Sequence, residues 1–502
     1  MASLHRKLEL TPKYPRVYSL GGELRPGSVR DAVWRAGKLV SELAALGRLG
    51  MGKRVIIIGS GVSALSAAIH AMACKTEVFI IRNRLVGKSP FEECAIREIC
   101  PNTFDFPGHH WNQQFFPVSG VNMEYPCHVR LETGIADGVY SSVYSQYESF
   151  CSSFPTLIDV ANDATTSEVV SERHLVRVEY SDAGGQKTRR SDVLILATGI
   201  GTLTRKVFDD SDPPLASEFE GFHYFDNDPV LAESLNGNGA RKRILLIGGG
   251  DGSLVDFVRL LTHQLSPQRA LTRVPLSKGE LNQLRNLSIK TWKRLEKYGA
   301  RELHRELVTH QQELKPVLDG IWSRSKVADA IHAMMIPPDR DRPVVQIACD
   351  CFHFGISYLA TRVMAELIAR CLAEDITREN GDIRPFRFTI RANRVNRVGG
   401  GKCGGLQDRK DGCPTHPHNV TFRKVFCSGQ VPAQCEASLR DNSCFPDNLL
   451  VVNSADGDHF DQVMMRVGTD YLAGLPLDLK MEIRARGQIW DVPAMYRCRS
   501  KA

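Results

Sequence analysis

The chain has 502 residues, of which 42% are hydrophobic and 24% are charged, with a formal net charge of +7. This length suggests two to four domains, and this composition excludes a largely disordered or collagen-like protein. No apolar run approaches the about 20 residues that span a bilayer, and the first ten residues lack the apolar core of a secretion signal. We therefore expect a cytoplasmic protein with no membrane partner.

Residues 1–50 are interpreted as an N-terminal lead-in to the first domain. Tyr14-Pro15 and Gly21-Gly22 are expected to interrupt regular structure there. Ser28 can cap a helix, in which Val33 and Val40 recur at helical spacing. The segment predicts an amphipathic helix packed on the body of the protein.

A strand, a glycine turn and a helix follow the lead-in. Arg54–Ile58 is apolar and β-branched, and Gly59-Ser60-Gly61-Val-Ser-Ala64 then leads into a helical run. In this context Gly59 permits the tight turn, Gly61 lets the backbone approach a diphosphate, and Ala64 allows close packing of helix on strand. The pattern predicts a dinucleotide site.

The end of the next strand departs from that pattern. A ribose-binding carboxylate is expected about 20 residues after the first glycine, but Arg82 stands there. An arginine at this place is consistent with a 2′-phosphate, with stacking on adenine, with a ribose held by another group, or with a decayed site.

A second glycine turn lies 189 residues after the first. Arg243–Ile247 is again a buried strand, and Gly248-Gly-Gly250-Asp251-Gly-Ser253 precedes a helix. Between the two turns, an apolar strand ends at Ala197-Thr198-Gly199. Two glycine turns in the same structural context indicate two nucleotide-binding units.

The rest of the chain alternates helices and strands around one insertion. Residues 276–335 predict helices, and residues 273–305 hold nine Lys and Arg against three Asp and Glu. Aromatic residues are sparse in this basic stretch, so we do not expect nucleic acid to be a partner. If the protein binds a protein partner or associates with itself, we expect the helical insertion to form the contact. Near the end, a strand at 448–453 is followed by Gly457-Asp458, and a helix is predicted from Phe460 to Ala473.

These pieces, in this order, resemble flavoproteins with two dinucleotide-binding domains, the superfamily of flavin monooxygenases and thioredoxin reductases. The resemblance implies an α/β fold with two Rossmann-like domains and a helical insertion in or after the second. It divides the chain into a lead-in at 1–50, an FAD-binding domain at 51–200 and 440–480, an NAD(P)-binding domain at 201–390, and a Cys/His-rich loop region at 391–439.

The resemblance also implies the cofactors and the class of reaction. FAD would lie on Gly59, Ser60, Gly61 and Ala64, near Thr198 and Gly199, and NAD(P)H on Gly248, Gly250, Asp251 and Ser253. Asp458, after Gly457, would bond a flavin hydroxyl, and the helix from Phe460 would face the flavin. Arg269 and Arg273 would favour NADPH by binding a 2′-phosphate.

The resulting interpretation is an NAD(P)H-dependent flavin oxidoreductase acting on a small substrate or O₂. A degenerate nucleotide-sensing scaffold and an adenosylmethionine-type transferase are the alternatives. The chain lacks a CxxC redox pair.

Further candidates for chemistry come from histidines, aromatic residues and cysteines. His110, Trp111 and His459 are candidates for substrate stacking or proton transfer, against a structural role for this aromatic loop. Cys403, Cys413, His416 and Cys427 are weak candidates for zinc ligands, because they lack paired CxxC spacing.

Overall fold

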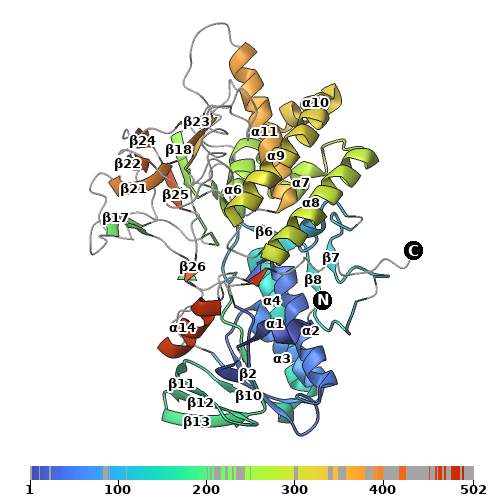
Figure 1. Cartoon of the computed structure of the whole chain (residues 1–502), viewed down its shortest axis with the longest axis vertical. Helices are drawn as coiled ribbons and strands as arrows, with labels where there is room; N and C mark the ends of the chain where they lie inside the picture. Colours follow the sequence, from blue (N-terminus) through green and yellow to red (C-terminus); the bar gives the residue numbers. More distant parts are fainter. Residues whose placement is uncertain are drawn as a thin grey trace.

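Figure 1 shows the computed structural model of the whole chain, with the N-terminal half below and the helical part of the second half above. The structure describes residues 3–10, 12–21, 24–25, 27–82, 89, 91–108, 110–121, 123–199, 202–203, 206–208, 216–220, 224–225, 227–228, 231–232, 243–248, 250–298, 303–336, 343–348, 358–378, 388–391, 393–399, 418–424, 451–452, 458–460, 462–465, 469–470, 476–486 and 489–490.

The first domain is built on a six-stranded sheet. Its order is β1-β2-β14-β4-β5-β10, and every strand is parallel to its neighbours except β1. The strands are, in that order, Glu9–Leu10, Tyr14–Ser19, Val193–Leu196, Arg54–Ile58, Glu77–Ile81 and Ile158–Ala161. Because the five long strands are parallel, their carboxyl ends meet at one edge, where α/β folds bind ligands.

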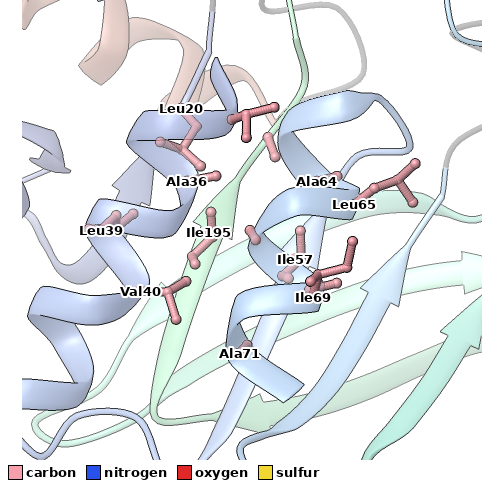
Figure 2. Close-up of a cluster of buried hydrophobic side chains, with 14 of the residues drawn as sticks. Leu20, Ala36, Leu39, Val40, Ile57, Ala64, Leu65, Ile69, Ala71 and Ile195 are labelled. Carbon is pink, nitrogen blue, oxygen red and sulfur yellow. The ribbon is translucent and has the colours of Figure 1, made fainter. Parts of the chain in front are cut away.

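Different elements cover the two faces of this sheet. Val55 and Ile57 of β4 face a core with α2 (Val29–Ala45), α3 (Val62–Ala73) and α4 (Ala136–Ser153). Figure 2 shows α2 and α3 side by side, with Val40 and Ile69 directed toward Ile57 and Ile195.

The opposite face carries an antiparallel sheet and a C-terminal helix. Ile56 and Ile58 share a core with the sheet β11 (Thr165–Ser171), β12 (Val176–Asp182) and β13 (Gly185–Ser191), and with α14 (Leu477–Arg486). Both faces of the parallel strands are therefore buried, which explains their continuous apolar sequences.

The N-terminal segment is part of this domain rather than a lead-in. The predicted helix is confirmed as α2, and Ser28 caps it by accepting a hydrogen bond of 2.9 Å from the Asp31 N–H. The expectation that Tyr14-Pro15 interrupts regular structure is wrong, because β2 pairs with β14. Proline is tolerated at the second position of the strand because that residue does not need to donate to the ladder.

The second domain contains another parallel sheet. Its order is β23-β20-β19-β18-β25, and all four pairings are parallel. The strands are Val451–Val452, Phe388–Arg391, Val344–Ala348, Arg243–Ile247 and Gln462–Met465. Helices α6 (Asp251–Thr262) and α11 (Leu359–Arg378) pack in the core of this domain.

The predicted helical insertion is confirmed between α6 and β19. It consists of α7 (Pro267–Leu271), α8 (Lys278–Tyr298), α9 (Leu303–Trp322) and α10 (Ser325–Met334). Leu284 of α8, Leu314 of α9 and Ile331 of α10 join the core of the second domain. The insertion thus separates two adjacent strands, β18 and β19, by almost 100 residues of sequence without moving them apart in space.

The predicted helix from Phe460 to Ala473 is wrong. Asp458–Phe460 forms β24, Gln462–Met465 forms β25, and Thr469–Asp470 forms β26. β24 pairs with β22 (His418–Lys424), which pairs with β21 (Asn393–Gly399), and β26 pairs with β15 (Thr202–Leu203). Residues 462–465 form a strand because they pair in parallel with β18 in the second sheet, and this pairing outweighs the helix propensity of the segment.

The C-terminal return to the first domain therefore comes late in the chain. Within the range 440–480 assigned to the FAD-binding domain, β23 and β25 belong to the second sheet, and α14 packs on the first domain. The remaining short elements are α1 (Leu4–Leu8), β3 (Leu24–Arg25) with β27 (Ile489–Trp490), β6 (Glu98–Ile99) with β9 (Gly134–Ile135), β7 (Phe115–Phe116) with β8 (Leu131–Glu132), and β16 (Lys206–Phe208) with β17 (Ala216–Glu220).

The close packing of α2 on α3 depends on Gly37. A Cβ at Gly37 would lie 2.4 Å from Tyr125 Cε2 and 2.7 Å from His70 Nε2, and both of those side chains are buried.

We expect Gly37→Ala to lower the free energy of unfolding by about 1–3 kcal/mol, because the core cannot admit the extra methyl. The exposed Gly138 of α4 has no atom within 4 Å of its Cβ position. Gly138→Ala is therefore the control, expected to raise stability by about 0.5 kcal/mol in denaturant titrations; equal effects of the two substitutions would contradict the argument.

Candidate functional site

The first glycine turn lies at the carboxyl edge of the first sheet. Gly59 follows β4 and has φ of 141°, and a Cβ there would lie 2.2 Å from the Ala197 carbonyl oxygen. The Gly59 N–H donates to Ile81 O at 3.0 Å, and Ala197 N–H donates to Ile58 O at 2.8 Å. Only glycine fits this position, because both the backbone angle and the neighbouring carbonyl exclude a side chain.

Gly61 has the opposite surroundings. It is the N-cap residue of α3, no side chain caps the helix, and no atom lies within 4 Å of its Cβ position. The space that a side chain at Gly61 would fill, at the N-terminus of α3, is therefore open. An uncapped helix N-terminus beside such a space fits the diphosphate of a dinucleotide, because its N–H groups and dipole favour an anion.

The other predicted residues of the first site gather at the same edge. Ala64 is fully buried where α3 packs on the strands, and Thr198 and Gly199 follow β14 directly. Gly199 has φ of 69°, so the chain turns sharply at the end of this central strand. The structure therefore brings Gly59, Gly61 and Thr198 together, as the parallel strand order requires.

Arg82 follows β5, and α4 positions its side chain. Its Cζ lies 5.9 Å from the ring centre of Tyr144 and 5.4 Å from that of Tyr147. Its backbone is fixed as well, since Arg82 N–H donates to Ala161 O at 2.9 Å. The Nε atom is buried and has no hydrogen-bond partner among the described groups, so this donor is available to a ligand at the end of the strand.

Tyr140 is a site residue that the sequence analysis missed. Its hydroxyl donates to the Ser60 carbonyl of the glycine turn at 3.3 Å. Burial raises the pKa of Tyr140 to about 12, and the negative charge of Glu92 adds to this shift. The helical spacing of Tyr140, Tyr144 and Tyr147 indicated a shared face of α4, but nothing in the sequence showed that this face lies over the turn.

The second glycine turn repeats the geometry of the first. Gly248 follows β18 with φ of 116°, and its N–H donates to Ala348 O at 2.7 Å. Gly250 is the N-cap residue of α6, again without a side-chain cap. Ser253 is fully buried in the first turn of this helix. The second site therefore also presents an uncapped helix N-terminus at the carboxyl edge of a parallel sheet.

Asp251, the first residue of α6, is directed toward the start of α11. Its Oδ1 accepts the Tyr358 N–H at 3.1 Å, and it also accepts a hydrogen bond from the Thr361 side chain. Burial raises the pKa of Asp251 to about 6, against the effect of these hydrogen bonds. The carboxylate thus supplies the acceptor that ties the N-termini of α6 and α11 together.

A loop of the first domain joins the two sites by packing on the second domain. Phe106 lies within the core of the second domain, and Arg97 forms a buried ion pair with Asp256 of α6. Thr103 Oγ1 donates to Gln268 Oε1 at 2.7 Å, and the Phe104 ring centre lies 3.8 Å from that of Tyr358. The described part of this boundary therefore combines a buried ion pair and a hydrogen bond with aromatic contacts.

Arg269 does not select a 2′-phosphate in this arrangement, which corrects the sequence-based expectation. It lies on α7, beyond the C-terminal end of α6, whereas the glycine turn is at the N-terminal end. Its Nε donates to Glu98 Oε2 at 3.0 Å, and Ser266 binds the same carboxylate. Arg273 follows α7, also at that end of α6.

The candidate catalytic residues lie in two separate parts of the structure: His110 and Trp111 in one loop of the first domain, and His459 on β24. Trp111 packs edge-on against Phe106 and contacts the second core, and its carbonyl accepts from Gln268 Nε2 at 2.8 Å. This is the structural role considered as the alternative. His110 lies close enough to Asp105 to lower the pKa of that carboxyl, opposing the larger effect of burial, which raises it. His459 lies on β24, paired with Asn419.

Several other predicted residues fall outside the described part of the chain. Gly457 lies outside the described residues. Asp458 begins strand β24 in the second domain rather than a helix facing the first. Cys403, Cys413, His416 and Cys427 also lie outside the described residues. Within the described ranges, no group of three or more His, Cys, Asp or Glu side chains is placed to hold a metal ion.

Comparison with known proteins places this geometry in a family. Residues 53–254, which include both glycine turns, match the family model described as pyridine nucleotide-disulphide oxidoreductase. The match covers two-fifths of the chain and supports, for that part, the superfamily of flavoproteins with two dinucleotide-binding domains. The match confirms the Rossmann-like α/β fold class and, as a general class, a flavin-dependent oxidoreductase that uses NAD(P)H.

Other comparisons are more distant. No curated protein matches the sequence. The structure is similar to thioredoxin reductase of Lactococcus lactis, with 11% identity, a TM-score of 0.33, and coverage of 84% of this chain and 81% of that one. It is also similar to the bacillithiol disulfide reductase of Bacillus cereus, with 9% identity, a TM-score of 0.34, and coverage of 84% and 78%. At these scores the likeness carries no argument, so the assignment rests on the family match and the sheet topology.

The helices of the second half do not change this assignment. Among the described residues, no helix combines the length and apolarity needed to cross a membrane.

Proposed function

We propose that the chain binds FAD at the first glycine turn and a nicotinamide dinucleotide at the second. The observation that carries the proposal is the pair of uncapped helix N-termini, at Gly61 of α3 and Gly250 of α6, each at the carboxyl edge of a parallel sheet. When bound, the flavin would accept hydride from the nicotinamide and pass the electrons to a small substrate or O₂. The protein's own contribution is to bind and orient the two cofactors.

The substrate is unlike that of a reductase with a paired active-site disulphide. The sequence has no CxxC pair, and Cys74, Cys94, Cys100, Cys127 and Cys151 are thiols rather than members of a disulphide. Cys94 and Cys100 lie in the loop at the domain boundary, and burial raises the pKa of both thiols, to about 12 for Cys100. Thiols held in the neutral form are poor nucleophiles. We therefore propose that electrons leave the flavin directly to a small molecule or O₂.

The nicotinamide preference depends on the strand next to the second glycine turn. The expectation of NADPH rested on Arg269 and Arg273, which lie at the wrong end of α6. The strand beside β18 is β19, which ends at Ala348, and the sequence continues with Cys349-Asp350. A carboxylate after the second strand of such a unit binds the ribose 2′-hydroxyl of NADH. We accordingly propose NADH as the preferred donor.

A spectrum tests the proposal. The purified protein is expected to carry, or take up when supplied, the yellow absorbance of FAD, and anaerobic NADH should bleach it at lower concentration than NADPH. A protein that stays colourless in excess FAD would refute the flavin site. A yellow protein bleached better by NADPH would keep the flavin site and refute only the NADH preference.

The Gly61→Ala substitution tests the location of the flavin. In the ligand-free protein the added methyl meets no atom and φ is −80°, so we expect the free energy of unfolding to change by less than about 0.5 kcal/mol. The affinity for FAD should fall by about tenfold or more, because the methyl group occupies the space beside the helix N-terminus. FAD binding is measured by fluorescence quenching, with Gly138→Ala as the control. Unchanged binding in Gly61→Ala would place the flavin elsewhere.

A further inference from the structure

Three side chains at the domain boundary keep buried polar atoms that no described group satisfies. They are Oγ of Ser253, the hydroxyl of Tyr358, and Nε and Nη2 of Arg30. Ser253 is in the first turn of α6, Tyr358 precedes α11, and Arg30 is near the start of α2 in the first domain. These atoms come from both domains.

Contacts through Asp251 and Phe104 connect Tyr358 with Arg30, and Ser253 lies two residues after Asp251 on α6. Tyr358 N–H donates to Asp251 Oδ1 at 3.1 Å, which fixes Tyr358 beside the first residue of α6. The Tyr358 ring lies 3.8 Å from that of Phe104, and Arg30 Cζ lies 6.0 Å from the centre of the same Phe104 ring. A residue of the N-terminal helix α2 is thereby brought close to the second glycine turn.

The ion pairs of Arg30 do not use all of its donors. Arg30 is 1% exposed, and Nη1 donates to Asp105. Nη2 lies 3.6 Å from Asp31 Oδ1, beyond hydrogen-bond distance. Arg30, Asp31, Asp251 and Arg35 are all close enough to act on the Tyr358 phenol, whose pKa burial raises well above its usual value.

Buried donors without acceptors destabilise a folded protein, and such groups are few. Several at one place, beside an uncapped helix N-terminus, indicate an acceptor that a ligand supplies. An arginine fork and a hydroxyl are suited to phosphate oxygens.

We propose that Tyr358 and Arg30 complete the second dinucleotide site, donating hydrogen bonds to the ligand's diphosphate from across the domain boundary. The inference rests on the proposed function of the second glycine turn. It adds that the first domain itself contributes to nicotinamide dinucleotide binding, through a helix that precedes the matched region 53–254.

Tyr358→Phe is the sharpest test, because it removes only the unsatisfied hydroxyl. We expect the unliganded protein to be at least as stable as wild type, since no described group loses a partner. The Kd for NADH, measured by anaerobic calorimetry on FAD-loaded protein already reduced with dithionite so that no hydride can be transferred, should rise about tenfold, as expected for a lost hydrogen bond to a charged group. Tyr180→Phe, in the antiparallel sheet of the first domain, is the matched control and should leave the Kd unchanged. An unchanged Kd in Tyr358→Phe would overturn the proposal.

Two further arms locate the contact. Arg30→Lys keeps the charge opposite Asp105 and removes the fork, so it should also weaken NADH binding about tenfold. In both variants ADP-ribose should lose as much affinity as NADH, because both carry the diphosphate. A loss confined to NADH, with ADP-ribose unaffected, would place the contact at the nicotinamide and overturn the assignment to the diphosphate.

The failure of this inference differs from failure of the proposed function. If wild type binds FAD and NADH and the variants do so equally well, only the inference fails. If wild type takes up no FAD, ADP-ribose is titrated into variants that also carry Gly61→Ala. That substitution blocks the first glycine turn, so ADP-ribose reports binding at the second site alone. Absence of ADP-ribose binding there would refute both the second site and the inference.

Discussion

Replacing Asp256 by alanine should lower the free energy of unfolding by about 3–5 kcal/mol. Arg97 and Asp256 are 1% and 0% exposed, and Arg97 Nη2 donates to Asp256 Oδ2 at 3.1 Å. Arg259 is also buried nearby, where burial and the charge of Arg97 lower its pKa to about 10. Asp256→Ala would therefore leave two buried guanidinium groups facing each other without their carboxylate.

The control for this substitution is an ion pair of similar geometry at the surface. Arg54 Nε lies 3.0 Å from Glu77 Oε2, but these side chains are 65% and 49% exposed. Glu77→Ala should change stability by less than about 0.5 kcal/mol, because water solvates the remaining charge. Both variants are measured by denaturant unfolding followed by tryptophan fluorescence. If Asp256→Ala cost no more than Glu77→Ala, the boundary between the domains could not depend on this pair.

Gly59→Ala has the second large expected effect. We expect a loss of about 2–5 kcal/mol, the sum of a strained backbone at φ of 141° and the collision of Cβ with Ala197 O at 2.2 Å. Because the collision separates β4 from β14 at the cofactor edge, FAD binding should be lost as well. Thermal unfolding and fluorescence titration with FAD measure the two effects.

Gly50 provides the matched comparison. Its φ of 133° is similar, but no atom lies within 4 Å of its Cβ position. Gly50→Ala should cost only the backbone strain, about 1–2 kcal/mol, and should leave FAD binding intact. The difference between the two variants isolates the steric term. Equal losses would show that Ala197 moves aside and that this turn tolerates a side chain.

The sequence predicted the secondary structure correctly where residues within one element determine it. Arg54–Ile58, its glycine turn and α3 follow from an apolar run, glycines and helical spacing, and Ser28 caps α2 as expected. The errors fall where pairing decides the structure. Tyr14–Ser19 forms a strand because β1 pairs with Tyr14 and β14 pairs with Val17–Ser19, and Gln462–Met465 forms a strand because it pairs with β18.

The candidate sites divide in the same way. Gly59, Gly61, Gly248 and Gly250 could be found from the sequence because each meets a requirement of its own turn. Tyr140, Tyr358 and Arg30 could not, because their proximity to those turns comes from helices that are distant in the sequence. The assignment of Arg269 failed for this reason too: nearness in sequence placed it after the glycine turn, and the length of α6 carries it to the other end.

From the sequence alone came two strand–glycine–helix units, the helical insertion between α6 and β19, and the resemblance that the family match over residues 53–254 supports. These depend on residue types and short spacings, which local sterics and apolar periodicity control. The tertiary structure decided that the N-terminal segment completes the first sheet, that β24 and β25 belong to the second domain, and that Arg30 approaches the second glycine turn. Such contacts are set by burial and strand pairing between distant segments, and no local pattern in the chain encodes them.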